Sequence, residues 1–111
     1  MIYSEEEMLF PEKFIYKVMM DDSMEPQIPE GAIVTIRNVE TNEDIHQADP
    51  QVIYYVEINH LKKELRYLLR LDNKLIMLPV NRKYGYELYD LDENLIVVLG
   101  TVQSWYCDIK A

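Results

Sequence analysis

The chain has 111 residues, 49% of them hydrophobic, and it carries a formal net charge of -9. This length suffices for one domain with a real core, and the composition is that of a folded protein, which excludes a disordered chain. The acidic balance argues against direct nucleic-acid binding, because phosphates are neutralised by patches of Lys and Arg.

Cysteine content and hydropathy indicate the compartment. Cys107 is the single cysteine and cannot form an internal disulfide, which is typical of a reducing cytoplasm. We interpret it as a small hydrophobic residue of a C-terminal strand. The sequence has no apolar run of membrane-spanning length and no signal-peptide pattern. We therefore predict a cytoplasmic protein without a membrane partner.

In chain order, residues 1–13 are predicted to be a linker remnant or N-terminal arm, and residues 14–111 a mostly β domain. Segments rich in β-branched and aromatic residues, separated by Pro, Gly, Asn and Asp, predict the strands. Their expected ranges are 14–18, 32–37, 51–58, 64–71, 74–79, 86–91, 95–99 and 101–106. The range 51–58 shows little alternation, which indicates that both of its faces are buried.

The range 64–71 alternates more clearly. Its odd positions predict an apolar face, made of Leu65, Tyr67, Leu69 and Leu71. Its even positions predict a mostly polar face, made of Glu64, Arg66, Leu68 and Arg70. A short helix would also fit the leucine spacing, but the turn signal Asp72-Asn73 before the next strand favours a hairpin.

The loop between the first two predicted strands holds Ser23. It reads Asp22-Ser23-Met24-Glu25-Pro26 and continues as Ile28-Pro29-Glu30-Gly31-Ala32-Ile33-Val34. Its prolines and Gly31 stop regular structure and fix turns. A serine held in a stiff loop between buried strands suits nucleophilic catalysis, and it equally suits a structural turn.

The combination Ser-Met-x-Pro and Gly-x-x-Val, at this spacing between two strands, resembles the signature of the LexA-like and phage CI-like repressors, the S24 group of serine peptidases. The resemblance implies a LexA C-terminal type of fold, a twisted multi-sheet β domain. It covers about residues 14–107, including a segment at Leu78-Pro79-Val80-Asn81. Two positions depart from the family pattern: Asp21 stands where Gly is usual, and Ala32 where Asp is usual.

The resemblance also implies a Ser–Lys dyad, with Ser23 as nucleophile and a desolvated, neutral lysine as its base. Counting back from Asp72-Asn73-Lys74, the lysine position falls on Arg66. Arginine keeps its proton and cannot serve as a base. A gap in the alignment would instead place Lys62 or Lys63 there, although both are expected near a hairpin tip.

With arginine in that position, a structural role for Ser23 is favoured, its hydroxyl bonding to nearby backbone. Met24 is interpreted as a core residue, and Asp21 and Asp22 as solvated loop charges. A buried Arg66 would need a carboxylate partner, and Asp21 and Asp22 are the candidates for it. Residues 1–22 contain no Ala, Gly or Cys, the residue types at which self-cleaving family members are cut.

The remaining polar signals predict no metal or cofactor. His46 and His60 are interpreted as exposed loop residues, because neither has a partner at metal-ligand spacing. A run of aliphatic residues, Gly100 and a second run end the chain. The family resemblance implies that these last strands form a dimer interface, with Val97, Val98, Val102 and Trp105 as its candidate residues.

These observations favour the C-terminal dimerisation or oligomerisation domain of a phage-type or bacterial transcriptional repressor, without autoproteolytic activity. The alternative is a self-cleaving S24 peptidase domain with a Ser–Lys dyad. A signal peptidase ranks third, because the chain lacks a membrane anchor. The expected partner is a second copy of the chain, and DNA would be contacted only through a helix-turn-helix domain that this chain lacks.

Overall fold

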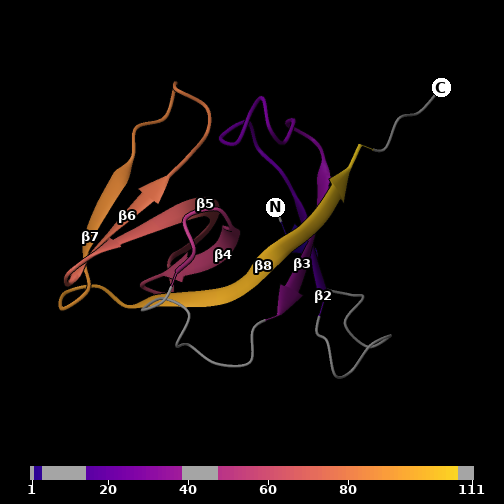
Figure 1. Cartoon of the computed structure of the whole chain (residues 1–111). Coiled ribbons are helices and arrows are strands. Elements are labelled where there is room, and N and C mark those ends of the chain that lie inside the picture. The colour runs from indigo at the N-terminus through magenta and orange to yellow at the C-terminus, as the bar shows by residue number, and fades with distance from the viewer. Residues whose placement is uncertain (1, 4–14, 39–47, 108–111) are drawn as a thin grey trace.

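The computed structural model describes residues 2–3, 15–38 and 48–107, and every regular element in these ranges is a β-strand. The strands are β1 (Ile2–Tyr3), β2 (Ile15–Met19), β3 (Ile33–Asn38), β4 (Ile53–Ile58), β5 (Lys62–Leu71), β6 (Lys74–Leu78), β7 (Glu87–Asp90) and β8 (Ile96–Tyr106). They form one sheet in the order β1-β2-β3-β8-β4-β5-β6-β7, curled as Figure 1 shows. The prediction of a mostly β domain is confirmed.

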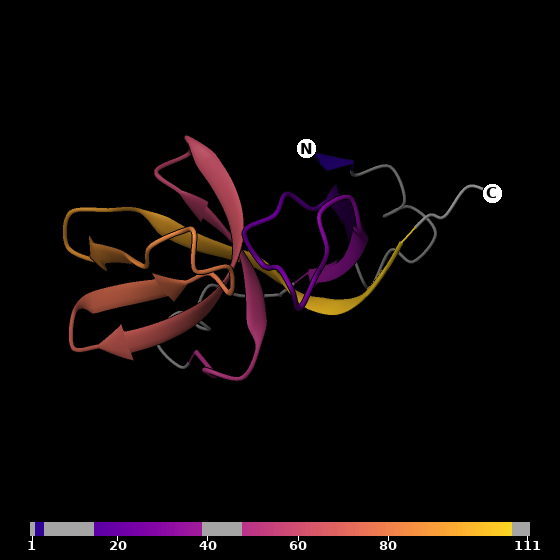
Figure 2. The same ribbon diagram turned by 90° about the horizontal axis from the view of Figure 1, so that it is seen from above.

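Strand β8 joins the two halves of this sheet. Its first half pairs with β4 and its second half with β3, and both neighbours meet it at Gly100 and Thr101. Each of these pairings contains a register shift near that point, between Thr35 and Ile36 in β3 and between Tyr55 and Val56 in β4. Figure 2 shows β8 running from one half of the molecule to the other.

The prediction of two final strands, 95–99 and 101–106, is therefore wrong, since β8 is continuous from Ile96 to Tyr106. Gly100 does not end the strand. A Cβ atom at this position would lie 2.4 Å from the carbonyl oxygen of Arg37 and 2.6 Å from Cγ2 of Ile36. The glycine is needed because the backbone of β3 approaches it too closely for any side chain.

Strand β4 lies between two hydrophobic clusters, as its lack of alternation predicts. The odd-numbered Ile53 and Tyr55 pack in the first cluster with β2, β3 and the Ser23 loop. The even-numbered Tyr54, Val56 and Ile58 pack in the second cluster with residues of β5, β6 and β8. Burial on both faces makes β4 the centre of the domain.

The predicted faces of β5 are only partly correct. Its odd face packs on the first cluster at Leu65 and Tyr67, but Leu69 and Leu71 lie beyond that cluster and are exposed. Its even face points to the inside of the curled sheet, where Leu68 belongs to the second cluster and Arg66 is also buried. The curl of the sheet, and not the alternation of the sequence, decides which residues of β5 are covered.

The candidate interface residues near the C-terminus separate into two groups. Val98 is only 2% exposed and belongs to the second cluster, so it is a residue of the monomer core and not of the predicted interface. Val97 and Val102 are half-buried, and Val102 packs against the first cluster. Trp105 is exposed near the end of β8. A charge at position 98 would therefore report on folding and not on association.

Candidate functional site

The Ser23 loop is held against the sheet by its own apolar side chains. Met24 and Ile28 are fully buried in the first cluster, as expected for Met24, whereas Pro26 is exposed. The amide of Gly31 donates to the carbonyl of Met20 at 2.8 Å, and Gly31 has a φ of 89°, a left-handed conformation that favours glycine. Anchored in this way, the loop presents Ser23 in a fixed position, fully buried.

The hydroxyl of Ser23 donates to the side chain of Asp21. Its Oγ lies 2.6 Å from Oδ1 of Asp21, and the amide of Ser23 donates to the same oxygen at 2.9 Å. This arrangement corrects two expectations. The serine hydroxyl bonds to a carboxylate and not to backbone, and Asp21 has a defined partner although it is exposed. A turn closed by an aspartate side chain fixes the serine.

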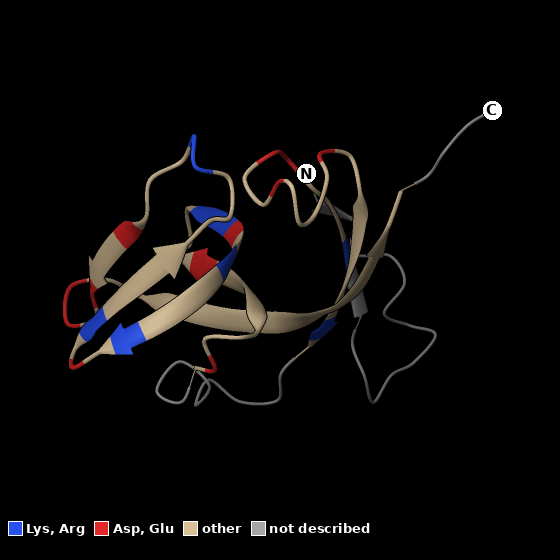
Figure 3. Ribbon diagram, turned by 45° about the horizontal axis from the view of Figure 1, so that its top comes forward, with Lys and Arg blue, Asp and Glu red and all other residues tan. Residues whose placement is uncertain are grey.

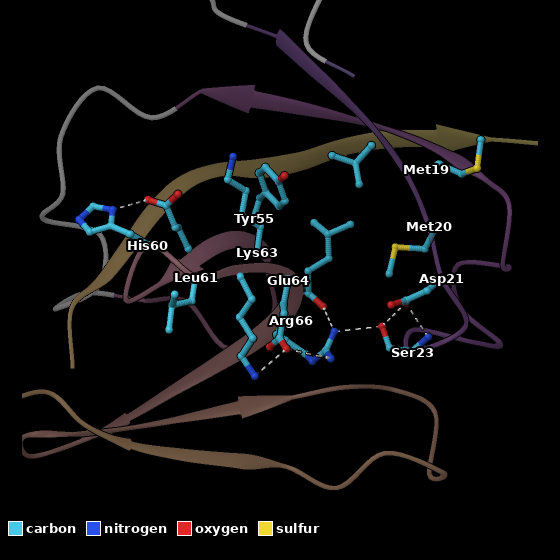
Figure 4. Close-up of a pocket in the computed structure, with 14 residues that line it drawn as sticks. Met19, Met20, Asp21, Ser23, Tyr55, His60, Leu61, Lys63, Glu64 and Arg66 are labelled. Carbon is cyan, nitrogen blue, oxygen red and sulfur yellow. Dashed lines mark hydrogen bonds and ion pairs between the residues drawn. The ribbon is translucent and has the colours of Figure 1, made fainter. Parts of the chain in front are cut away.

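Arg66 reaches the same hydroxyl from β5. Its Nη1 donates to Oγ of Ser23 at 3.0 Å and to the carbonyl of Leu65 at 2.8 Å, as Figure 4 shows. The residue that the sequence places at the lysine position therefore does contact the serine. A guanidinium does not accept a proton, so Arg66 holds Ser23 by hydrogen bonding and charge and cannot activate it.

The carboxylate partner of Arg66 is Glu64, with Nη2 of the arginine 3.8 Å from Oε2 of the glutamate. Arg66 is 6% exposed, so its charge needs such compensation. Asp21 contributes through the serine, because its oxygen and Nη1 of Arg66 both bond to Oγ of Ser23. Glu64 lies two residues before Arg66 on the same face of β5, so the alternation of the strand places the two groups side by side, and the ion pair is with this residue and not with Asp21 or Asp22.

Lys62 is the other candidate base, and its surroundings favour the charged form. Its Nζ lies 3.0 Å from Oε2 of Glu87 and 3.3 Å from Oε2 of Glu64. The hydrogen bond to Glu87, together with the charge of Glu64, raises the pKa of Lys62 although partial burial opposes this. Lys62 is the first residue of β5 and directly follows the turn of the β4–β5 hairpin. A lysine held as ammonium cannot take the proton of Ser23.

A second network holds the Ser23 loop to the segment after β6. The carbonyl of Ser23 accepts from the amides of Val80 and Asn81, at 3.2 and 2.9 Å, and the side chain of Asn81 donates to the carbonyl of Asp22 at 2.8 Å. Lys83 and the hydroxyl of Tyr84 bond to the carboxylate of Asp22. Figure 3 shows the acidic loop beside this basic segment.

Asp22 therefore has defined partners, which differs from the expected free loop charge. The hydrogen bonds from Lys83 and Tyr84 lower the pKa of Asp22 below its ordinary value. Asp22 holds the Ser23 loop to the segment after β6, and this is a structural role and not a role in chemistry at the hydroxyl of Ser23. Asn81 and Lys83 were not among the candidate site residues, and only the family-like Leu-Pro-x-Asn segment pointed to this region.

A cleft of about 390 Å³ opens beside Ser23 and Arg66 (Figure 4). One wall comes from the end of β2 and the start of the Ser23 loop, and the other from the β4–β5 hairpin. The lining residues are Val18, Met19, Met20, Asp21, Ser23, Tyr55, Glu57, His60, Leu61, Lys62, Lys63, Glu64, Leu65 and Arg66. The cleft has the position of a peptide-binding site next to the serine, but the base that hydrolysis requires is not supplied by Arg66 or Lys62.

The histidines add no metal site among the described residues. His60 is exposed at the rim of the cleft, 3.4 Å from the carboxylate of Glu57, and His46 lies outside the described residues. In residues 2–3, 15–38 and 48–107, no group of three or more His, Cys, Asp or Glu side chains could hold a metal ion. These same ranges contain no helix able to cross a membrane.

The family model described as Peptidase S24-like matches residues 2–102 of the chain. The chain belongs to the S24 peptidase-like family. The match includes the Ser23 loop and all of β5, and it confirms the resemblance to the S24-like domain of LexA- and CI-type proteins. Among curated proteins, none matches the chain. Within this S24-like domain, an arginine of β5 contacts the hydroxyl of Ser23.

One pH-dependent prediction concerns Glu64 and Glu87 of this S24-like domain. Both have an Oε1 atom that is buried without a hydrogen-bond partner in the described structure. Burial, and then the neighbouring Glu87, raise the pKa of Glu64. Burial also acts to raise the pKa of Glu87, but hydrogen bonds from Glu64 and Lys62 outweigh it, and the net pKa is lowered. Of the two carboxyl groups, Glu64 is thus the one that resists ionisation.

We expect Glu64→Gln to stabilise the domain increasingly as pH rises above 4.5, the ordinary value for this carboxyl group. Below that pH the carboxyl is protonated in both folded and unfolded chains, so the substitution changes little. Above it, the unfolded chain ionises freely while the folded one resists, and the wild type loses stability until the folded pKa is passed. Denaturant unfolding across this pH range measures the difference, with the exposed Glu93→Gln as control. A destabilised Glu64→Gln variant at neutral pH would contradict the prediction.

Proposed function

We propose that this S24-like chain is the C-terminal dimerisation or oligomerisation domain of a phage-type or bacterial transcriptional repressor, and that its peptidase site is inactive. The observation that carries the proposal is the bond from Nη1 of Arg66 to Oγ of Ser23 at 3.0 Å, where a dyad would need a neutral lysine. Contact with DNA would fall to another domain, because the net charge of -9 disfavours phosphate binding by this one.

Two residues that differ from the family pattern, at positions 21 and 66, support an inactive site because they meet at one atom. Asp21, where the family has Gly, accepts a hydrogen bond from the hydroxyl of Ser23, and Arg66, at the lysine position, donates to the same oxygen. The added negative charge and the permanent positive charge compensate each other around the hydroxyl. A serine engaged on both sides serves as a structural bridge between its loop and β5.

The alternative function is a self-cleaving peptidase that uses Ser23 and Lys62. The family membership and the cleft beside Ser23 favour it. The ion pairs of Lys62 with Glu64 and Glu87 weigh against it, because they stabilise the ammonium form. The inactive site therefore accounts for more of the observed contacts.

Ser23→Ala distinguishes the two functions through stability and activity together. We expect the variant to lose about 1–3 kcal/mol of unfolding free energy, because Nη1 of Arg66 and Oδ1 of Asp21 each lose their hydrogen bond with the buried hydroxyl. Denaturant unfolding measures this loss, and Ser104→Ala, at an exposed position of β8, is the control. A catalytic serine is instead commonly removed at little or no cost in stability.

The same proteins should be incubated with a linker peptide containing an Ala-Gly bond, at neutral and alkaline pH, and the products followed by mass spectrometry. We expect no cleavage by the wild type or by Arg66→Lys, since Asp21 and Glu64 would keep the introduced lysine charged. Cleavage by the wild type that disappears in Ser23→Ala would refute the inactive site and establish the peptidase.

A further inference from the structure

The outer side of β5, β6 and β7 carries an apolar surface that residues 15–38 and 48–107 leave uncovered. We define this outer apolar face by six residues, Leu69, Leu71, Ile76, Leu78, Tyr86 and Leu88. Leu69, Leu71, Tyr86 and Leu88 are 38%, 53%, 67% and 55% exposed. The opposite side of the same strands is already filled, because Leu68, Leu75 and Met77 are fully buried in the second cluster.

The outer apolar face is continuous from strand to strand. In the register of the sheet, Leu69 pairs with Ile76 and Ile76 pairs with Leu88, so these side chains form a row across the three strands. With Lys74, the face lines a groove of about 370 Å³. An antiparallel sheet with one solvated face normally alternates apolar and polar residues, and a contiguous exposed apolar patch marks an interaction surface.

The same surface ends at a free strand edge. β7 is the last strand in the sheet order and pairs only with β6 among the described strands. The β6–β7 hairpin forms one end of the molecule in Figure 1. An edge strand bordered by exposed apolar side chains can be extended by a strand from another chain, which supplies hydrogen bonds and apolar contact together.

Charge on this surface favours a second copy of the chain as the occupant. Lys74 and Asp90 are cross-strand partners at its border, with Nζ 3.3 Å from Oδ2, so the border carries one charge of each sign. Two copies with a net charge of -9 repel each other over most of their surfaces, and a charge-balanced apolar face is where this repulsion is weakest.

We propose that the outer apolar face and the β7 edge form a self-association surface, in which β7 pairs antiparallel with β7 of a second copy about a two-fold axis through Leu88. Antiparallel partners share a sheet face, so this register places Leu88 against Leu88 and Tyr86 against Asp90. It joins the two outer apolar faces into one. The surface deepens the proposed oligomerisation role, but it is separate from the end of β8, where Trp105 lies.

Cysteine cross-linking tests the register. In a Cys107→Ser background, which removes the native thiol, Leu88→Cys would lie about 4.5–5.5 Å from its symmetry mate between Cα atoms, within disulfide range. We expect mild oxidation to give a covalent dimer of this variant. Leu61→Cys, exposed at the β4–β5 hairpin and outside the face, is the matched control and should form no covalent dimer. Equal cross-linking of both variants, or none at Leu88, would overturn the proposed register.

Sedimentation tests the surface without a thiol. We expect Leu88→Asp to weaken self-association by about tenfold or more, with Leu61→Asp unchanged and near-ultraviolet circular dichroism showing that both remain folded. Trp105→Ser separates this surface from the one at the end of β8. Loss of association in Trp105→Ser but not in Leu88→Asp would refute the inference and leave the repressor role standing. A wild type that is monomeric at every concentration would overturn it as well, and would leave the face to a different protein.

Discussion

Arg66→Ala is expected to lower the free energy of unfolding by about 3–5 kcal/mol, the range for removal of one partner from a buried charge pair. The guanidinium is 6% exposed and donates to Ser23 and to the carbonyl of Leu65. Its loss leaves the Glu64 carboxyl buried with less compensation and also leaves a cavity beneath the Ser23 loop. Equilibrium unfolding in urea, with the slope compared to that of the wild type, measures this loss.

Two further variants separate the causes of that loss. Arg66→Lys keeps a positive charge, but an ammonium group does not reproduce the geometry with which the guanidinium bonds to Ser23 and Leu65. We therefore expect an intermediate loss of unfolding free energy. Arg82→Ala removes an exposed arginine from the segment after β6, and we expect a change within about 0.5 kcal/mol. A loss below 1 kcal/mol for Arg66→Ala would mean that the polar bridge to Ser23 does not stabilise the fold, and the structural role of the serine would then lack support.

Gly100→Ala should be the other severe substitution, with a loss of about 3 kcal/mol or more. The added Cβ would meet the carbonyl oxygen of Arg37 at 2.4 Å, which is backbone and cannot rotate away. Relief requires β3 and β8 to separate at the point where β8 also pairs with β4, so both halves of the sheet are affected. Thermal unfolding measures the result.

Gly85→Ala is the matched control for this substitution. A Cβ at position 85 has nothing within 4 Å, so we expect a change within about 0.5 kcal/mol. Similar unfolding temperatures for the two variants would show that β3 and β8 can move apart at little cost. The close approach at Gly100 would then not be what holds the two halves of the sheet together.

Local sequence determines much of this fold. β-branched and aromatic runs predict each strand from β2 to β7 to within two residues at either end. The absence of alternation in β4 correctly predicts burial of both its faces, because a strand with apolar residues on both faces must pack against other residues on each of them. The spacing of Ser23, Met24, Pro26 and Gly31 is likewise a local property, and it was sufficient to indicate the S24 family.

The candidate site could be predicted only in part. Counting along the chain brought Arg66 to the position of the family lysine, and the structure places its guanidinium against Ser23. Asp21 is exposed, as a solvated loop charge would be, but the sequence does not predict the hydrogen bonds that Asp21 and Asp22 make. A carboxylate has no periodic signal in a sequence, so whether Asp21 faces water or a hydroxyl depends on the turn that its own side chain closes.

The set of strands, the loop that carries the serine and the family thus follow from the amino-acid sequence. The folded sheet is needed to see that Gly100 continues a strand, that Val98 is in the core, and that Glu87 of β7 meets Lys62 and Glu64 of β5. The physical reason is the curl of the sheet. Pleating fixes which side chains share a face of one strand, whereas contacts between strands distant in sequence fix which of those faces is covered.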